Sequence, residues 1–218
     1  MSDKKIVIID YGMGNVGSVA AAIDYLQGNY LISNKRKDLA GADALILPGV
    51  GAFGAAIENL QDLGLVEELN QQVLMNKKPF FGICLGMQLL ALDSVEQGYH
   101  RGFGWIEGHV IALKPEKKLR VPHVGWNNVN FDRSNLFFQR IDEGAHFYFD
   151  HSFCLACKED LIIATCDYGG TCVAAIQKEN IFAVQFHPEK SQRNGLKMIR
   201  NFLNYIDAQI ECRQDQVC

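Results

Sequence analysis

The chain has 218 residues, of which 48% are hydrophobic and 21% charged, so it can bury the core of one globular domain. Its formal net charge is −4 and it contains no long block of Lys and Arg, which argues against binding to nucleic acid or to an anionic membrane. The apolar run after Lys4 and Lys5 is too short for a signal peptide or a membrane-spanning helix, so we expect a cytoplasmic protein. Seven cysteines without an export signal favour free thiols over a disulfide framework.

The first half of the sequence alternates between strand and helix patterns. The β-branched run Ile6–Ile9 ends at a glycine-rich turn, which is the pattern of a strand buried on both faces. The elements predicted after it are a helix at 16–26 and strands at 30–33 and 44–47, then a long helix at 55–75 and a strand at 79–83. This alternation predicts an α/β domain with helices on both faces of a mostly parallel sheet.

From about residue 100 the spacing of apolar residues becomes that of strands. The predicted strands are 109–113, 146–150, 161–165, 172–177 and 181–185. We expect them to add antiparallel strands to the sheet, which makes it mixed. A closing helix is predicted at 193–208, with Ser191 as its N-cap. No repeat or linker divides the chain, so we expect one domain over residues 1–208 and a C-terminal tail over 209–218 that is frayed after Glu211.

Cys84 is the strongest candidate for a catalytic residue. The segment Gly82-Ile83-Cys84-Leu85-Gly86 has a glycine two residues before and two residues after a nucleophile, between a predicted strand and a helix predicted at 85–92. Such a turn strains the backbone of the nucleophile and leaves no room for a side chain at either glycine. It also sets the sulfur at a helix N-terminus, where the helix dipole favours the thiolate. The alternative is a buried structural cysteine.

His187-Pro188-Glu189 follows a predicted strand and provides partners for a cysteine nucleophile. Proline should keep this segment extended, so that the side chains of residues 187 and 189 share an orientation. His187 would then act as the general base towards Cys84, and Glu189 would hold the imidazole from behind. A surface turn is the alternative for these three residues alone. Together with Cys84, they predict a Cys-His-Glu triad.

These motifs resemble those of the class I glutamine amidotransferases, over essentially the whole chain. The blocks that carry the resemblance are GICLGMQ at 82–88 and HPEKS at 187–191. Within that class, the chain most resembles the amidotransferase subunits of imidazole glycerol phosphate synthases, through YGMGN at 11–15, PGVGAF at 48–53, PHVGWN at 122–127 and YFDHSF at 148–153. The resemblance implies a single-domain α/β amidotransferase fold, hydrolysis of L-glutamine to glutamate and ammonia through a cysteine thioester, and no cofactor.

The resemblance also implies a partner. Amidotransferases of this kind form a heterodimer with a separate (β/α)8-barrel synthase subunit of histidine biosynthesis, which receives the ammonia through a channel. A dry channel keeps ammonia unprotonated and hence nucleophilic. By resemblance, Asn15 and Trp126 lie towards the synthase interface and the channel mouth. A role in core packing is the alternative for Trp126, because tryptophan is highly buried on average.

Attack on the glutamine carboxamide creates an oxyanion, which needs preorganised N–H donors. By resemblance these donors are the backbone amides of Gly51 and Leu85; an ordinary turn is the alternative for the glycine loop. The resemblance places the remaining glutamine contacts at Gln88, His151, Ser152 and Phe153.

Two other motifs suggest different functions. The loop from Gly12 to Gly17 fits the dinucleotide fingerprint, but residues 34–36 offer no acidic partner and would at most suit an NADP-dependent oxidoreductase. Cys154 and Cys157 have the C-x-x-C spacing, yet no second pair completes a zinc site, so no metal is expected.

Three departures from the family pattern leave the ammonia acceptor open. They are Gly17, Asp150 and Phe153. The alternative that they suggest is a paralogue that serves another acceptor, such as an amidating enzyme of surface-polysaccharide synthesis. A noncatalytic docking subunit is a further alternative, although the triad is complete.

Overall fold

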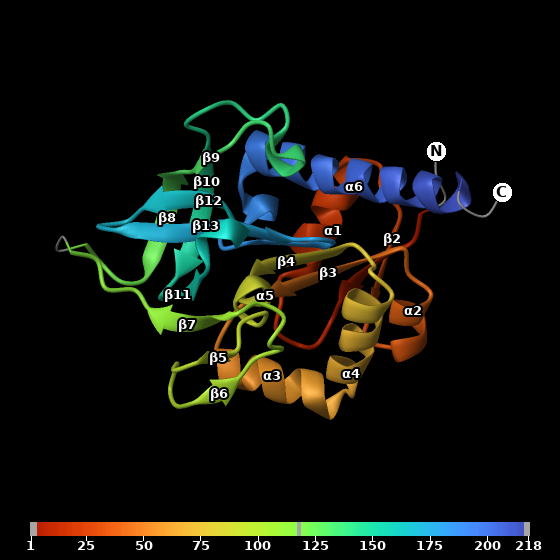
Figure 1. Ribbon diagram of the computed structural model, residues 1–218, viewed down its shortest axis with the longest axis horizontal. Coiled ribbons are helices and arrows are strands. Elements are labelled where there is room, and N and C mark those ends of the chain that lie inside the picture. Colours follow the sequence, from red (N-terminus) through yellow and green to blue (C-terminus); the bar gives the residue numbers. More distant parts are fainter. Residues whose placement is uncertain (1–3, 117–118, 216–218) are drawn as a thin grey trace.

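The computed structural model describes residues 4–116 and 119–215 and is built around an eight-stranded mixed sheet (Figure 1). In spatial order its strands are β2 (Tyr30–Ser33), β1 (Ile6–Ile9), β3 (Ala44–Gly49), β4 (Phe80–Cys84), β14 (Ile181–Val184), β13 (Thr171–Lys178), β12 (Ile162–Asp167) and β9 (Asn130–Phe131). The first five strands of this order, from β2 to β14, are parallel to one another. Each of the last three, β13, β12 and β9, pairs antiparallel with the strand before it in this order. The predicted α/β class and mixed sheet are confirmed.

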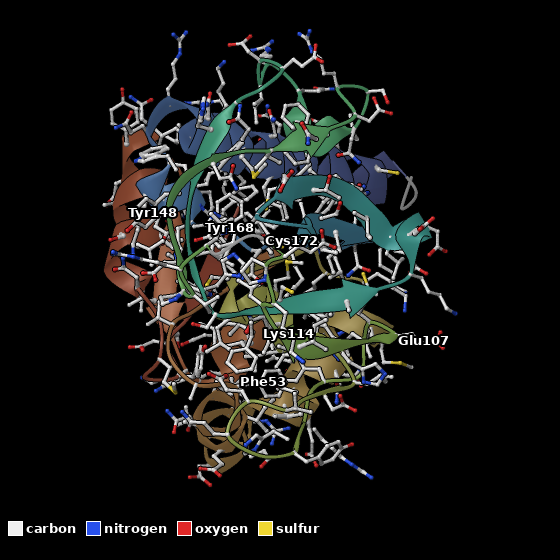
Figure 2. The ribbon with its side chains drawn as sticks, turned by 90° about the vertical axis from the view of Figure 1, so that its left-hand side faces the viewer. Phe53, Glu107, Lys114, Tyr148, Tyr168 and Cys172 are labelled. Atoms are coloured by element: carbon white, nitrogen blue, oxygen red, sulfur yellow. The ribbon has the colours of Figure 1, made fainter. Side chains whose placement is uncertain are left out.

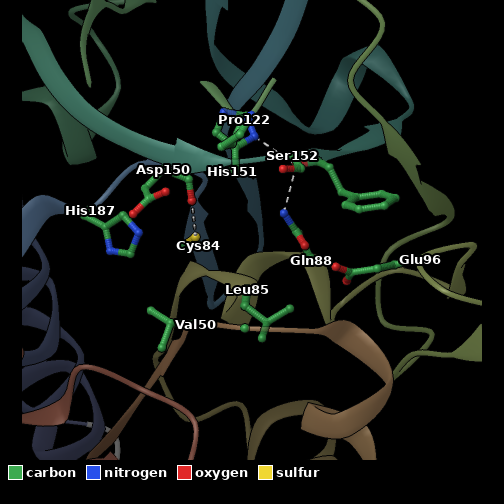
Figure 3. Close-up of a pocket in the computed structure, with 12 residues that line it drawn as sticks. Val50, Cys84, Leu85, Gln88, Glu96, Pro122, Asp150, His151, Ser152 and His187 are labelled. Atoms are coloured by element: carbon green, nitrogen blue, oxygen red, sulfur yellow. Dashed lines mark hydrogen bonds between the residues drawn. The ribbon is translucent and has the colours of Figure 1, made fainter. Parts of the chain in front are cut away.

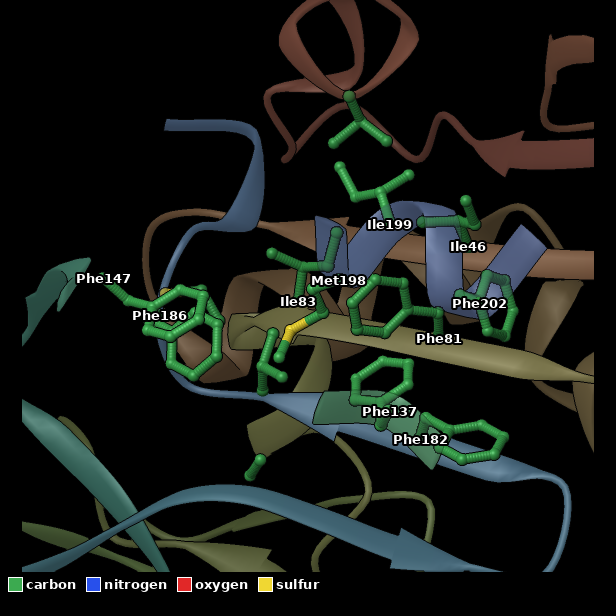
Figure 4. Packing of buried hydrophobic residues seen from close by; sticks show 14 of the residues in the cluster. Ile46, Phe81, Ile83, Phe137, Phe147, Phe182, Phe186, Met198, Ile199 and Phe202 are labelled. Carbon is green, nitrogen blue, oxygen red and sulfur yellow. The ribbon is translucent and has the colours of Figure 1, made fainter. Parts of the chain in front are cut away.

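Helices cover both faces of the sheet. On one face lie α1 (Val16–Tyr25) and α6 (Gln192–Asp215), and on the other α2 (Arg36–Ala40), α3 (Phe53–Asp62) and α4 (Leu65–Leu69) (Figure 1). The side chains of β1 point to the two faces of the sheet in turn. Ile6 and Ile8 pack with α1 and α6, whereas Val7 and Ile9 pack with α3 and α4. On the α6 face, phenylalanines such as Phe81 and Phe202, whose rings are tilted against each other, fill the space between sheet and helix (Figure 4). This core fixes the strand ends that carry the site.

Two smaller sheets correct the expectation that all later strands join the main sheet. One pairs β8 (His123–Asn128) with β10 (His146–His151), and the other has the order β11 (Phe153–Cys157), β7 (Gly108–Ala112), β5 (Asp93–Ser94) and β6 (His100–Arg101). The strands predicted near 109–113 and 146–150 therefore exist but lie in these sheets. Neither β8 nor β11 was predicted, because β8 contains glycine and asparagine, which have low strand propensity, and β11 follows β10 almost directly.

The predicted helices differ from the observed ones in length. The helix expected at 55–75 is interrupted at Gly64, whose φ of +64° ends α3, and the chain continues as α4 and a wider helical segment, η1 (Asn70–Met75). The helix expected at 85–92 is only α5 (Leu85–Gln88). Short 3-10 turns occur at η2 (Leu136–Phe138), η3 (Glu159–Leu161) and η4 (Pro188–Lys190).

The C-terminal helix is longer than predicted. Helix α6 continues past the predicted end at residue 208 to Asp215, so the expected fraying after Glu211 is wrong up to Asp215; residues 216–218 of the expected tail lie outside the described residues. Ser191 directly precedes α6 and its carbonyl accepts the Gly195 amide at 3.1 Å, so it holds the predicted N-cap position, but its side chain has other partners. Its hydroxyl donates to the His187 carbonyl at 2.6 Å and accepts the Tyr148 amide at 2.9 Å, so it ties β10 to the turn after β14. Over the described ranges, no helix is both long and apolar enough to cross a membrane.

Candidate active site

Cys84 stands on a strained turn between β4 and α5. Its backbone has φ 55° and ψ −110°, a conformation that costs energy for a residue with a side chain. The neighbouring glycines are required by packing, because a Cβ at Gly82 would lie 2.8 Å from the Gly86 carbonyl oxygen and one at Gly86 would overlap the Leu47 carbonyl. The predicted strain and the predicted need for both glycines are confirmed.

His187 lies three residues after β14, the parallel neighbour of β4, so it and Cys84 emerge at the same edge of the sheet. Its Nδ1 is 2.8 Å from Oε1 of Glu189, and the two side chains are only 2% and 1% exposed. The expectation of an extended segment here is wrong, because Pro188 starts the 3-10 turn η4, which is a position that proline favours. The turn nevertheless brings the imidazole and the carboxylate together.

The charge state of His187 follows from these contacts. Burial by itself lowers the pKa of His187, but its interactions with the Cys84 and Glu189 side chains outweigh burial and raise the pKa to about 10. Because a carboxylate only accepts, Nδ1 carries a proton for Glu189 and Nε2 is left to face Cys84. The protonated imidazole is therefore favoured beside the sulfur.

A buried pair of glutamines, Gln88 and Gln185, supports the nucleophile. Gln88 was predicted, whereas Gln185 was not. Gln185 Nε2 donates to the Cys84 sulfur at 3.7 Å, and its Oε1 accepts from Gln88 Nε2 at 3.1 Å. Gln88 also donates to the Phe153 carbonyl at 3.0 Å. Both hydrogens of the Gln88 side-chain nitrogen are thus donated to protein groups. Gln185 could have been found, because it lies two residues before His187 at the end of the same strand.

A cavity of about 250 Å³ opens above Cys84, a volume that suits an amino acid rather than a dinucleotide (Figure 3). Its lining consists of Val50, Gly51, Cys84, Leu85, Gln88, Glu96, Pro122, Asp150, His151, Ser152, Phe153 and His187. The structure therefore brings together eight of the predicted site residues, with Glu189 behind His187. Glu96 was not predicted; its Oε2 accepts the Phe53 amide at 2.8 Å.

The glycine loop next to Cys84 adopts a conformation that closes the predicted oxyanion hole. The Val50 amide donates to the Met13 carbonyl at 3.3 Å, so the Gly49 carbonyl of the same trans peptide points the opposite way. The β3–β4 ladder ends with Gly49 paired to Cys84, in a register that joins the Gly49 carbonyl to the Leu85 amide. A protein carbonyl therefore occupies the place in front of the Leu85 amide where an oxyanion would bind.

The two predicted interface residues lie outside this cavity. Trp126 on β8 is 47% exposed and its ring meets Tyr148 of β10 edge to face, with centroids 6.0 Å apart, so the alternative of core packing is wrong. Val124 on the same strand is also exposed, and Lys190 lies over the Tyr148 ring. Asn15 precedes α1 and is half-buried. The outer face of β8 is thus an apolar surface at the edge of the site.

Comparison with known proteins identifies the family. The model of the family described as glutamine amidotransferase class-I matches residues 7–206. The chain belongs to this family. It is 47% identical over 207 residues to imidazole glycerol phosphate synthase subunit HisH 2 of Vibrio vulnificus, covering 94% of this chain and 96% of that protein. With subunit HisH 1 of Campylobacter jejuni (strain RM1221), it shares 46% identity over 198 residues, 91% and 98% of the two chains.

Solved structures agree on the fold of this amidotransferase. A structure titled glutamine amidotransferase superposes with a TM-score of 0.72 at 20% identity and covers 93% of this chain and 98% of that one. The glutaminase domain of CTPS from Trypanosoma brucei, solved with bound acivicin, has a TM-score of 0.64 at 20% identity and covers 92% and 94%. The expected class I amidotransferase fold is confirmed.

The competing motifs of this amidotransferase have packing roles. Gly14 of the fingerprint loop packs on Pro48, where a Cβ would lie 3.1 Å from the carbonyl oxygen, so this glycine allows two loops to approach. Cys154 and Cys157 lie on strand β11 rather than on the helix that a redox pair requires. In residues 4–116 and 119–215, no group of three or more His, Cys, Asp and Glu side chains has an arrangement suited to a metal ion.

Proposed function

We propose that this amidotransferase hydrolyses L-glutamine at Cys84 and delivers the ammonia to a (β/α)8-barrel synthase subunit that makes imidazole glycerol phosphate and aminoimidazole carboxamide ribotide. The observation that carries the chemistry is the strained Cys84 beside the buried His187–Glu189 pair, at the floor of an amino-acid-sized cavity. The observation that supports the acceptor is the identity of 40–47% to proteins named as subunits of imidazole glycerol phosphate synthase.

The reaction begins with attack of the Cys84 thiolate on the carboxamide carbon, which forms the C–S bond and an oxyanion. As the oxyanion collapses, the C–N bond breaks and the His187 imidazolium gives its proton to the departing nitrogen, which leaves as ammonia. Water then attacks the thioester, with the neutral imidazole taking one of its protons. The second oxyanion collapses, the C–S bond breaks, and the thiolate leaves beside the imidazolium, which restores the starting pair; the product leaves as the γ-carboxylic acid and loses its proton to solvent to become glutamate. Glu189 stabilises the positive charge of His187 whenever the ring is protonated and holds Nδ1 in place when it is neutral.

The cavity walls provide complementary groups for the α-amino and α-carboxylate groups of glutamine. Glu96 borders the cavity, and its carboxylate suits the α-ammonium group. The segment from His151 to Phe153 forms the opposite wall and offers backbone groups to the substrate. Gln88 acts through the Phe153 carbonyl that it holds.

Activation requires a rearrangement of the glycine loop. Rotation of the Gly49–Val50 peptide would withdraw the Gly49 carbonyl from the Leu85 amide and turn the Val50 N–H towards the cavity. Gly51, which has φ +101° and also borders the cavity, can follow without a side chain in the way. Assembly of these donors completes an oxyanion hole, whose loss costs about 10²–10³ in rate where it has been tested in other enzymes. The isolated chain should therefore be nearly inactive.

The exposed face of β8 is the surface to which we assign the synthase subunit. Trp126 and Val124 expose apolar area there, next to Tyr148 and the turn that carries His187. Asn15 precedes α1 at the loop that faces Pro48–Gly51. Docking on β8 would thus act close to both the base and the oxyanion loop.

The test is glutamate release with and without the barrel subunit and its phosphoribosyl-aminoimidazole-carboxamide substrate. We expect the synthase subunit and its substrate to stimulate glutamate release by the wild-type chain at least several-fold. We expect Cys84→Ala to release no glutamate although its melting temperature equals that of the wild type. Stimulated hydrolysis by Cys84→Ala would exclude the proposed nucleophile. Hydrolysis that depends on Cys84 but is not stimulated would instead favour the paralogue, which is supported by the exposed Asp150 carboxylate at the cavity and by relatives numbered HisH 1 and HisH 2.

A further inference from the structure

A buried pair of histidines continues inward from the cavity wall. His151 Nδ1 is 2.9 Å from the Phe153 carbonyl oxygen, and its Nε2 is 3.0 Å from Nδ1 of His123 on the paired strand β8. His123 Nε2 is in turn 3.3 Å from the side-chain amide of Asn127, which also donates to the Asp167 carbonyl at 2.9 Å. Neither histidine belongs to the proposed catalytic triad.

The hydrogen bonds assign every ring proton in this chain of contacts. A carbonyl only accepts, so His151 Nδ1 carries a proton, and a neutral ring then leaves Nε2 as an acceptor. His123 must therefore donate from Nδ1, and its Nε2 must accept from Asn127. Each imidazole is required in a single neutral tautomer. A second proton on either ring would remove an acceptor that the chain of bonds uses.

The surroundings of His123 hold its ring in this orientation. The ring is 3% exposed and is stacked between Phe149 and Tyr168, with centroids 4.6 Å and 3.9 Å away; Figure 2 labels Tyr168. Burial lowers the pKa of His123 to about 4, with a smaller contribution from His151, and burial also lowers the pKa of His151. Both rings are thus neutral at physiological pH, as the hydrogen bonds require.

The Phe153 carbonyl is the point at which this chain of bonds meets the glutamine site. It accepts from His151 Nδ1 at the end of β10 and from Gln88 Nε2 on helix α5, and both residues line the cavity. Without the donor from His123, His151 Nε2 would be a buried acceptor with no partner. The ring could then take the tautomer with its proton on Nε2, and the Phe153 carbonyl would lose one of its two donors.

We propose that His123 is a positioning residue for glutamine binding, because its Nδ1–H fixes the tautomer of His151 and thereby holds the 151–153 wall of the cavity. The inference rests on the proposed function in one respect, namely that this cavity binds glutamine. His123 does not touch the substrate. It acts through His151 and the Phe153 carbonyl.

Asparagine and glutamine at position 123 separate hydrogen bonding from packing. In His123→Asn the amide nitrogen can occupy the position of Nδ1 and donate to His151, whereas in His123→Gln it reaches the position of Nε2, on the Asn127 side. Both amides are flat and fit between the two aromatic rings. We expect the KM for glutamine to stay within about two-fold of wild type in His123→Asn and to rise about ten-fold in His123→Gln, the effect of one buried hydrogen bond. Because Cys84 and His187 are untouched, kcat should change little.

The assay uses the chain with its barrel subunit, and KM does not depend on the fraction of folded protein. Equal KM values in the two variants, whether normal or raised, would overturn the proposal, since packing alone treats them alike. The ¹⁵N chemical shifts of His151 provide a second readout, with Nδ1 protonated in the wild type and in His123→Asn, and Nε2 protonated in a detectable fraction of His123→Gln. An unchanged His151 tautomer in His123→Gln would also overturn it. This readout needs no glutamine hydrolysis, so it tests the inference even if the proposed function fails.

Discussion

Replacing Glu189 with Gln removes the negative charge behind His187 with almost no change in volume. The wild-type contact is short, at 2.8 Å, and both groups are nearly fully buried, so solvent does little to screen it. Gln can still accept through its oxygen, but the charge assistance is lost. A hydrogen bond with a charged partner contributes about 1.5–3 kcal/mol. Since about 1.4 kcal/mol changes a rate ten-fold, kcat for glutamine hydrolysis should fall about 10- to 150-fold.

The dependence of kcat on pH in Glu189→Gln provides an independent test of the role of Glu189. The pKa of His187 is raised to about 10, partly by Glu189, so the ring keeps its proton throughout the neutral range. Without the carboxylate that pKa falls towards its ordinary value, and the decline of kcat at alkaline pH should begin at a lower pH than in wild type. Glutamate release, measured with the synthase subunit across the neutral and alkaline range, checks both effects. Glu58→Gln on the exposed side of α3 is the control. Wild-type kcat with an unshifted alkaline decline would refute the assigned role of Glu189.

Three further substitutions test the packing around the site. Ser191→Ala leaves the Tyr148 amide of β10 without its acceptor and removes one of the two donors to the His187 carbonyl, which keeps the Lys190 amide, so urea unfolding should show a loss of about 1–3 kcal/mol; an unchanged midpoint would contradict this. Tyr11→Phe removes a buried hydroxyl without a hydrogen-bond partner among the described residues, so the unfolding free energy should stay equal or rise by about 1 kcal/mol, and a clear loss would reveal a partner. Gly86→Ala sets a Cβ on the Leu47 carbonyl oxygen and should cost more than about 3 kcal/mol in the same measurement; normal stability would show that the turn can shift.

The parts of the fold that sequence reasoning predicted are those with strong local signals. Ile6–Ile9 is recognisable because all four residues are buried, and the Cys84 turn because two glycines mark where side chains do not fit. The break at Gly64 was missed, since apolar spacing continues on both sides of a glycine whose left-handed conformation depends on its surroundings. Strand β8 was missed because its pairing partner β10 lies about twenty residues further along the chain and its own composition does not favour a strand.

The candidate site shows the same division. Cys84, His187 and Glu189 occur in short motifs whose chemistry is recognisable without a structure. Gln185 lies outside the quoted blocks, and His123 lies in the block at 122–127, whose residues do not by themselves indicate a chemistry. Their roles arise only where strands from distant segments meet, because Gln185 contacts Cys84 on β4 and His123 contacts His151 on β10. The conformation of the glycine loop was also beyond the sequence, because both orientations of the Gly49–Val50 peptide are compatible with the same residues.

Cys84 and His187 extend from adjacent strands of the central sheet, whereas Trp126, His123 and His151 belong to the separate β8–β10 sheet. The chemistry and the docking surface therefore rest on different sheets, which are joined where the Tyr148 backbone bonds to His187 and Ser191. Substitutions that reshape the outer face of β8 can alter which protein docks there while the nucleophile and its base keep their positions. After a gene duplication, one copy could thus acquire a new ammonia acceptor through changes in the small sheet, with the glutaminase inherited intact.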